Sequence, residues 1–363
     1  MPRQMSYDKV LFLTAGFLML GGLLMVGSTS SFASMKLDLP ANHYMVRQSV
    51  WMCAGLIAML VMMNVPYQRL ASGRLVGASL LLSVVALIGV FFMPAVNGAH
   101  RWLIFGPLRI QPSEFVKYVA ILLTAWVLSR KHDEVNDFWA VPLPLAIILG
   151  PIVVLIYFEP DLGSPVMLVA IIGLMVFAAG LRWRDGVALA SAGALALAAS
   201  VRFEAYRLER VLAFLRADDN ILSLEYQLRQ SLVALGHGGA FGLGLGGGHQ
   251  KAYFLPVAHT DFVYAVIGEE FGLIGTVAVL VAFLLLFGRG VRAALGAPDR
   301  FGFYLALGIT SLIVVQALVN MSVCVGLVPT KGLALPFLSY GGSSLLATLA
   351  ATGVLLNVSQ HSN

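Results

Sequence analysis

Charged residues are scarce in this sequence. Lys, Arg, Asp and Glu make up 11% of the 363 residues, whereas about 25% is usual in a soluble domain. Cysteine is nearly absent: Cys53 and Cys324 both lie inside apolar runs without metal-ligand spacing, which argues against a disulfide framework and a zinc site. The net charge of +5 comes from Lys and Arg in short breaks between apolar runs. Without one basic stripe, no nucleic-acid partner is expected.

What the sequence does contain is apolar residues, which make up 59% of the chain. They form runs long enough to cross a bilayer. The predicted spans lie at about 10–30, 45–65, 74–94, 113–129, 139–158, 163–180, 185–201, 261–286, 302–325 and 335–358. We therefore expect an all-α polytopic membrane protein of about ten transmembrane helices, with residues 1–363 as a single domain. A hairpin that dips into the membrane around 159–163 is the alternative for the fifth and sixth spans.

The basic residues between the spans gather on the side that also carries both termini. They are Arg69, Arg74, Arg130, Lys131, Arg182, Arg184, Arg289, Arg292 and Arg300. By the positive-inside rule this side is cytoplasmic. The other side carries the 95–112 loop, the 159–163 turn, the 326–334 loop and one long extracytoplasmic loop at 202–260. Polar chemistry is therefore expected on the outer face of the membrane.

The long loop contains two stretches, 206–215 and 224–235, with apolar residues at helical spacing. This pattern predicts amphipathic helices lying in the membrane interface. A solvated loop without function is the alternative.

Ionisable residues inside apolar runs are costly, and each is a candidate for function. They are Glu114, Lys117, Asp161, Asp261, Glu269 and Glu270. Glu114 and Lys117 are three residues apart, so they share a helix face and can form an ion pair, either as pure structure or as part of a site. Asp161 either caps the following helix or forms a polar wall of a cavity that it shares with Glu114 and Lys117.

Asp261 is expected at the outer end of the eighth span, where a carboxylate is either the helix N-cap or a general base. Glu269 and Glu270 would then lie about 12 Å deeper, at 1.5 Å per residue. We expect at least one of them to pair with a buried Lys or Arg.

Glycine and hydroxyl residues mark two further stretches. Residues 242–247 match the G-x-G-x-x-G pattern, but no βαβ unit surrounds them, so a dinucleotide site is not expected. These glycines could let backbone N–H groups approach a polar head group, and Lys251 could add a cation for phosphate. Lys331 and Ser339 belong to breaker-rich and hydroxyl-rich stretches that frame the entrance to the last span. Close helix packing is the alternative role of these small residues.

Taken together, these motifs resemble the SEDS family of peptidoglycan glycosyltransferases from the first span to the last. The motifs are Gln111-Pro112-Ser113-Glu114, Glu159-Pro160-Asp161-Leu162-Gly163, the Gly-rich run ending in Gln250-Lys251, Ala258-His259-Thr260-Asp261-Phe262, Gly268-Glu269-Glu270 and Ser339-Tyr340-Gly341-Gly342-Ser343-Ser344. The stretches 329–333 and 255–261 are more similar to the FtsW branch than to RodA. Val257 departs from the acidic residue expected in that branch.

The resemblance implies polymerisation of lipid II into β-1,4 glycan strands, with Asp261 as the base that deprotonates the attacking hydroxyl. Arg101, Lys117, Lys251, Lys331 or a divalent cation (Mg²⁺ or Mn²⁺) would stabilise the leaving pyrophosphate. No organic cofactor is expected. The full set of substrate-binding positions that we expect is Arg101, Glu114, Lys117, Asp161, Lys251, His259, Thr260, Lys331 and Ser339.

The family further implies a location and partners. A multi-pass protein of the cytoplasmic (inner) membrane is expected, at the septum, with both termini cytoplasmic and the active site facing the periplasm. Its partners would be a class B penicillin-binding transpeptidase of the FtsI type and divisome activators of the FtsQ, FtsL and FtsB type.

Three other functions are compatible with parts of the pattern. Glu114, Lys117 and Asp161 could line the path of a lipid II flippase, although a flippase should also carry charges toward the cytoplasmic side. A RodA-type polymerase for elongation is a second alternative. A pure scaffold for division proteins is a third, but it would not need charged residues within the membrane.

Overall fold

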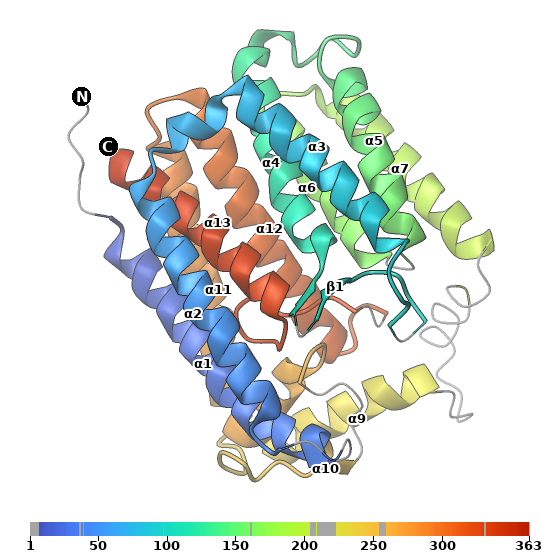
Figure 1. The fold of residues 1–363 in the computed structure, drawn as a ribbon, viewed down its shortest axis with the longest axis vertical. Coiled ribbons are helices and arrows are strands. Elements are labelled where there is room, and N and C mark those ends of the chain that lie inside the picture. The colour runs from blue at the N-terminus through green and yellow to red at the C-terminus, as the bar shows by residue number, and fades with distance from the viewer. Residues whose placement is uncertain are drawn as a thin grey trace.

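The computed structural model describes residues 7–35, 38, 40–96, 98–106, 108–159, 162–203, 208, 223–253, 259–329 and 332–362. Long helices packed side by side dominate the molecule (Figure 1). The α-helices are α1 (Lys9–Met35), α2 (His43–Asn64), α3 (Gly73–Val90), α4 (Pro112–Arg130), α5 (Pro142–Phe158), α6 (Gly163–Ala178), α7 (Trp183–Phe203), α9 (Ser223–Gly238), α10 (Gln250–Tyr253), α11 (Val263–Leu295), α12 (Arg300–Cys324) and α13 (Gly342–His361).

Short elements connect some of these helices. Two 3₁₀ helices, η1 (Tyr67–Ala71) and η2 (His132–Glu134), follow α2 and α4. Strands β1 (Leu103–Phe105) and β2 (Leu108–Ile110) pair antiparallel, with Leu103 opposite Ile110, and form a hairpin before α4.

The predicted fold class is confirmed. Among the described residues, seven helices are long and apolar enough to cross a membrane: α1, α2, α3, α7, α11, α12 and α13. Helices α5 and α6 are apolar but shorter, and α4 carries Glu114 and Lys117. Each of these ten helices overlaps one of the ten predicted spans.

The beginning of α1 and the ends of α11 and α13 meet at one end of the bundle, which we call the terminal end. There the Asp8 N–H donates to Ser359 Oγ (3.2 Å), and Asp8 Oδ2 pairs with Arg289 Nη2 (2.6 Å). Helices α9 and α10 lie at the opposite end (Figure 1). The predicted 224–235 helix is confirmed by α9, whereas most of the 206–215 stretch lies outside the described residues.

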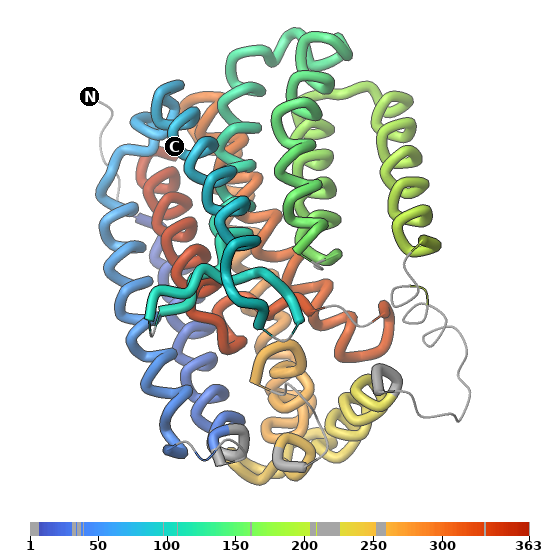
Figure 2. The backbone as a smooth tube through the Cα atoms, turned by 45° about the vertical axis from the view of Figure 1, so that its right-hand side comes forward, coloured from blue at the N-terminus to red at the C-terminus, as the bar shows by residue number. Residues whose placement is uncertain are grey.

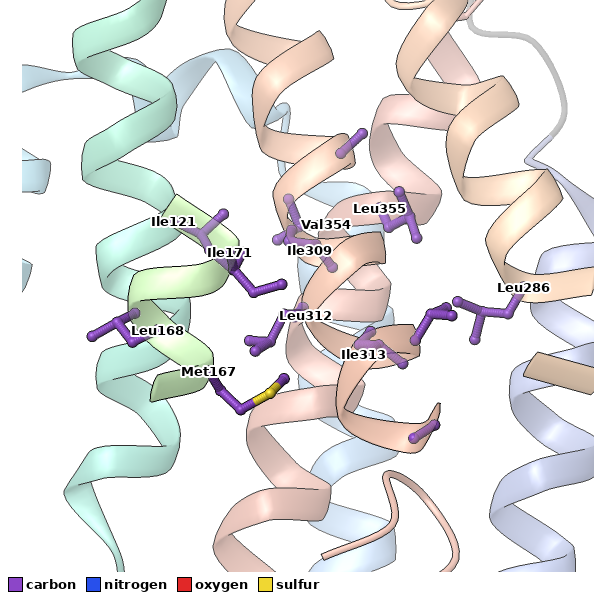
Figure 3. Packing of buried hydrophobic residues seen from close by; sticks show 14 of the residues in the cluster. Ile121, Met167, Leu168, Ile171, Leu286, Ile309, Leu312, Ile313, Val354 and Leu355 are labelled. Carbon is purple, nitrogen blue, oxygen red and sulfur yellow. The ribbon is translucent and has the colours of Figure 1, made fainter. Parts of the chain in front are cut away.

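Helix α12 occupies the centre of the bundle and packs against α4, α6, α11 and α13. Its side chains Ile309, Leu312 and Ile313 are each at most 3% exposed and point toward residues of those helices (Figure 3). A Cβ at Gly308 would lie 2.6 Å from Ile121 Cγ2, so glycine lets α4 approach α12 closely. Such close packing of small and branched residues is how helices associate where lipid removes the hydrophobic driving force.

Helices α5 and α6 are too short to reach the opposite end. Their 17 and 16 residues span about 25 Å at 1.5 Å per residue, less than a typical hydrocarbon thickness of about 30 Å. Figure 2 shows both helices ending well before α1 and α2 do. Two short helices occupy this stretch, and the end of α5 and the beginning of α6 lie well short of that end of the bundle, so the dipping hairpin stays an alternative to two full spans.

The predicted eighth span, 261–286, is wrong at its beginning. Helix α11 is broken at Gly272, whose backbone (φ 66°, ψ −159°) is not helical. Tyr264 Oη donates to Thr276 O at 3.3 Å, although twelve residues of straight helix would separate these residues by about 18 Å. Residues 263–271 therefore fold back along the following turns, and the membrane span starts after Gly272.

This reversal also corrects the predicted depth of Glu269 and Glu270. Helix α1 contacts Phe337, which belongs to the segment beside Asp261, through Gly22. It contacts Glu270 through Ser28. Six residues of helix correspond to about 9 Å. The two glutamates thus lie farther from the terminal end than Asp261 does, instead of deeper in the membrane.

Candidate active site

Asp261 lies in a partly buried turn that precedes the first segment of α11. The N-cap position of α11 is Phe262, and no side chain makes a capping hydrogen bond there. Asp261 is therefore not the helix N-cap that was the structural alternative. A Cβ at Gly332 would lie 3.4 Å from Asp261 Oδ2, so the carboxylate faces the backbone at Gly332.

The backbone on both sides of this carboxylate is held by one side chain of α12. Asn320 Nδ2 donates to Asp261 O (2.8 Å) and to Leu333 O (2.7 Å), and Asn320 is 1% exposed. A buried carbonyl without a partner is costly. Asn320 therefore fixes the distance between the chain at Asp261 and the chain at Leu333.

The 332–341 segment runs alongside residues 259–261. Ser339 Oγ donates to Thr260 O and accepts from Leu335 N (2.8 Å), and Tyr340 N donates to His259 O (2.8 Å). The last span was predicted from residue 335, but α13 begins at Gly342. The structure thus brings His259, Thr260, Asp261 and Ser339 together, as expected for one site, because residues 335–341 are not helical.

The 332–341 segment contains a strained residue and lies close to α1. Phe337 has φ of 65°, a left-handed conformation that is uncommon outside glycine. Its carbonyl oxygen lies where a Cβ of Gly22 would be, so α1 can pass only with glycine at that position. Strained residues of this kind persist where the surrounding structure over-determines them, often at functional sites.

The predicted ion pair between Glu114 and Lys117 is confirmed and connects to the same segment. Lys117 Nζ lies 2.9 Å from Glu114 Oε1 and donates to Gln316 Oε1 (3.1 Å). Gln316 Nε2 in turn donates to Ala334 O (2.8 Å). Lys117 is 1% exposed, so burial of its charge depends on Glu114 and Gln316. The pair has a structural function here, and a role in substrate binding stays a prediction.

Arg101 lies next to the end of α5. Its Nε donates to the carbonyl of Glu159 (2.7 Å), which is fully buried. The strand β2 that follows is tied to the beginning of α13, because Gln111 N donates to Ser343 Oγ (3.0 Å). Asp161 and Lys331, which were also expected at the site, lie outside the described residues.

An aromatic cluster that the sequence did not predict covers one side of the site. The rings of Tyr44, His259 and Tyr340 have centroids 5.1 to 5.7 Å apart. Burial lowers the pKa of His259 below its ordinary value of 6.5, so the ring is neutral at pH 7. Burial raises the pKa of Tyr340, while the charges of Arg47 and Arg109 act in the opposite direction. Arg47 makes a side-chain hydrogen bond to Tyr340. The backbone of Arg109 accepts from Ser343 Oγ (3.4 Å) at the beginning of α13.

Lys251 lies apart from the other residues that were expected to bind substrate. Its Nζ forms an ion pair with Glu270 Oε1 and donates to Ser28 Oγ (2.6 Å), and the two charged side chains are 1% and 0% exposed. This confirms the prediction that at least one of Glu269 and Glu270 pairs with a buried Lys or Arg. Binding of phosphate by Lys251 stays a prediction, and it would require this pair to open.

The glycine-rich loop also contacts α11. Leu243 N donates to Glu269 O (3.0 Å) and Gly244 N to Glu270 O (2.9 Å). Carboxylate oxygens of Glu269 accept from the N–H groups of His249 (2.8 Å) and Gln250 (3.1 Å) at the beginning of α10. The N–H groups of Leu243 and Gly244, expected to meet a polar head group, thus satisfy the backbone of the broken helix.

Sequence analysis missed the buried amides Gln48, Gln316 and Asn320. Gln48 Nε2 donates to Ser339 O (3.4 Å) and its Oε1 accepts from Gly341 N (3.4 Å), so all three amides hold the 332–341 segment or the turn at Asp261. Amides carry no charge, so ionisable residues inside apolar runs do not point to them. A signal did exist, because Gln316 and Asn320 are four residues apart and share one face of an apolar helix.

Comparisons with known proteins agree with this arrangement. The family of cell cycle proteins FtsW/RodA/SpoVE matches residues 8–363. The "Probable peptidoglycan glycosyltransferase FtsW" of Geobacter metallireducens is 41% identical, over 97% of this chain and 94% of the relative. The "Stage V sporulation protein E" of Bacillus subtilis is 39% identical, over 99% of each chain.

A solved structure shares the fold as well. A chain from a structure that concerns the coordination of polymerization and crosslinking by a peptidoglycan synthase complex is 31% identical, with a TM-score of 0.81 over 97% of each chain. The match of the family over residues 8–363 includes every element of the site described above. The chain is therefore a multi-pass membrane protein that belongs to the FtsW/RodA/SpoVE family.

Proposed function

We propose that this chain is a peptidoglycan glycosyltransferase, which polymerises lipid II into β-1,4-linked glycan strands. The observation that carries the proposal is the fixed carboxylate of Asp261, which faces Gly332 in a turn held by Asn320 and Ser339. The name of the 41% identical relative supports the activity. A single rigidly placed carboxylate is what a general base for a sugar hydroxyl requires.

The reaction moves one proton and one electron pair. Asp261 would take the proton from the 4-hydroxyl of the GlcNAc of one lipid II molecule. The oxygen of this hydroxyl forms a bond to the anomeric carbon of the MurNAc in a second lipid-linked chain. The bond from that carbon to the phosphate oxygen breaks, and its electron pair leaves with undecaprenyl pyrophosphate. Removal of the proton during attack raises the nucleophilicity of the oxygen.

The negative charge of the departing pyrophosphate needs positive groups nearby. Among the described residues, Arg101 beside Glu159 and Arg47 and Arg109 near Tyr340 are the cations that we propose for this role. Lys117 is already engaged with Glu114 and Gln316, so it would act mainly by holding the 332–341 segment.

A divalent cation is a further source of charge. Among the described residues, no group of three or more His, Cys, Asp or Glu side chains could hold one. The described site supplies one carboxylate, Asp261, which fits Mg²⁺ or Mn²⁺ only together with phosphate oxygens of the substrate. Bound in this way, the ion would neutralise charge on the pyrophosphate.

The location and partners follow from the same proposal. The basic residues between the spans favour cytoplasmic termini and an active site on the outer face. The septum is the expected location, because FtsW is the name of the relative. The solved relative comes from a complex that coordinates polymerization and crosslinking, which supports a class B transpeptidase as a partner. Activators of the FtsQ, FtsL and FtsB type are expected with it.

The test is glycan synthesis from purified lipid II by the protein reconstituted with its cognate transpeptidase. Asp261→Asn removes the base with little change of volume, so we expect polymer from the wild type and none from the variant. Asp133→Asn is the matched control, because its side chain is 86% exposed near Arg300, away from Asp261, and it should behave as wild type.

The outcomes separate the proposed function from its alternatives. Polymer from Asp261→Asn at the wild-type rate would overturn the assignment of the base. No polymer from the wild type, combined with transfer of lipid II across the bilayer, would overturn the polymerase and favour a flippase.

A further inference from the structure

Residues 239–247, between α9 and α10, read Gly-Ala-Phe-Gly-Leu-Gly-Leu-Gly-Gly and contain no polar side chain. We call them the apolar loop. Its three large side chains are exposed: Phe241 by 82%, Leu243 by 47% and Leu245 by 58%. Loops that end in water are usually built from polar turn residues together with glycine. An entirely apolar loop with exposed large side chains indicates a contact that the isolated chain does not make.

The backbone of the apolar loop is paired in part with the protein itself. Five of its N–H groups donate to carbonyl oxygens of the chain, those of Gly239, Gly242, Leu243, Gly244 and Gly247. Three of its carbonyls accept, Gly239 O from Leu273 N (2.9 Å), Ala240 O from Ile274 N (3.3 Å) and Gly244 O from Gly247 N (2.9 Å). Internal pairing of polar backbone groups is what hydrocarbon demands of any segment that enters it.

The apolar loop is also continuous with a surface of α11 suited to face lipid. Its bonds to Leu273 and Ile274 place it at the beginning of the membrane span, where these side chains are 62% and 60% exposed. Farther along the helix the exposed apolar side chains continue with Val277, Val281, Leu284 and Leu285. One apolar surface thus runs from the span onto the loop.

We propose that the apolar loop is inserted into the bilayer, where Phe241, Leu243 and Leu245 contact lipid acyl chains. The level of the loop, at the end of the bundle opposite to the terminal end, places it at the boundary of head groups and acyl chains, about 5–10 Å deep, as for interfacial helices. Water at this boundary reaches the other polar groups of the backbone. The inference is independent of the proposed enzymatic activity.

Nitroxide labels in the full-length protein, reconstituted into lipid nanodiscs, test the insertion. Cys53 is exposed and is first replaced (Cys53→Ser), while Cys324 is buried. Phe241→Cys and Leu245→Cys are labelled separately, so that one misfolded variant does not decide the result. Collision rates are measured with oxygen, which concentrates in the bilayer, and with a water-soluble nickel chelate.

Two control positions define the scale. Leu284→Cys reports the lipid-facing flank of α11, and Asp133→Cys reports water, because that side chain is 86% exposed. We expect the oxygen-to-nickel collision ratio at Phe241→Cys and Leu245→Cys to be shifted from the Asp133→Cys value toward the Leu284→Cys value. A ratio equal to that of Asp133→Cys would overturn the proposal. Protection from both reagents would also overturn it, because a protein partner would then cover the loop.

Discussion

At the scale of single residues, two uncharged amides of α12 hold the backbone around the candidate base. Asn320 bridges the carbonyls of Asp261 and Leu333, and Gln316 bridges Lys117 and the carbonyl of Ala334. Both amides are at most 4% exposed. The position of Asp261 therefore depends on residues that themselves have no charge to contribute to the reaction.

We expect Asn320→Ala to lower kcat about tenfold, which corresponds to roughly 1.4 kcal/mol of lost positioning. The substitution leaves two buried carbonyls without their shared donor, and Asp261 can then drift from the 332–341 segment. The KM for lipid II should change little, because Asn320 is buried and its amide binds the chain at Asp261, Leu333 and Cys324. Steady-state glycan synthesis at varied lipid II concentrations measures both constants.

Asn136→Ala is the matched control for this prediction. Its exposed amide donates to the carbonyl of Gly180 (3.1 Å), outside the site, so its removal should leave kcat unchanged. A wild-type kcat for Asn320→Ala would contradict the positioning role of Asn320. An increased KM with unchanged kcat would instead place Asn320 in substrate binding.

At the scale of elements, the break in α11 determines where Asp261 lies. A continuous helix from residue 261 would place the carboxylate at the rim of the bundle, with Glu269 and Glu270 below it. The reversal at Gly272 instead returns Asp261 to the level of Asn320 and leaves the glutamates to bind α1 and α10. The apolar loop packs against the exposed backbone of this break.

We expect Gly272→Ala to destabilise the protein by more than about 3 kcal/mol. Its φ of 66° with ψ of −159° is a conformation accessible essentially to glycine alone. The added Cβ would also lie 2.5 Å from Gly242 N, against backbone that cannot move aside. Thermal unfolding in detergent, followed by circular dichroism, measures the loss.

Gly288→Ala provides the control in the same helix. Nothing lies within 4 Å of a Cβ at Gly288, which is helical and exposed. Alanine should stabilise this position by about 0.5–1 kcal/mol. If both variants melted at the wild-type temperature, the break at Gly272 would not be a feature of the folded protein.

At the scale of the whole molecule, the distribution of charge predicts the orientation in the membrane. Of the nine basic residues that define the predicted cytoplasmic side, Arg289 pairs with Asp8 at the terminal end. The end of α5 and the β hairpin belong to the side of the bundle that carries Asp261, because Arg101 binds Glu159 and Gln111 binds Ser343. A membrane-impermeant maleimide can distinguish the two sides in intact cells.

In a Cys53→Ser background, we expect Arg109→Cys to be labelled in intact spheroplasts and Asp133→Cys only after the membrane is permeabilised. Both side chains are exposed, so access to the reagent should decide the result. Gel detection of the labelled protein is sufficient. The reverse pattern would contradict cytoplasmic termini and would move the candidate active site to the cytoplasm.

The sequence by itself determined the number and approximate bounds of the spans and the ion pair of Glu114 with Lys117. These features depend on hydrophobic run length and on helical spacing, which are local properties of the chain. The family motifs placed His259, Thr260, Asp261 and Ser339 among ten expected site residues, and the structure brings these four together although they come from segments about eighty residues apart.

Only the tertiary structure decided the path of the chain through the site. Gly272 lies in an apolar run that reads as continuous helix, and its break depends on contacts with the apolar loop. The non-helical 332–341 segment depends on amides of α2 and α12 that carry no charge signal. The ion pair of Lys251 with Glu270 also forms only in the folded chain. A polar group in lipid must be satisfied by some other part of the chain, and which part does so is a property of packing.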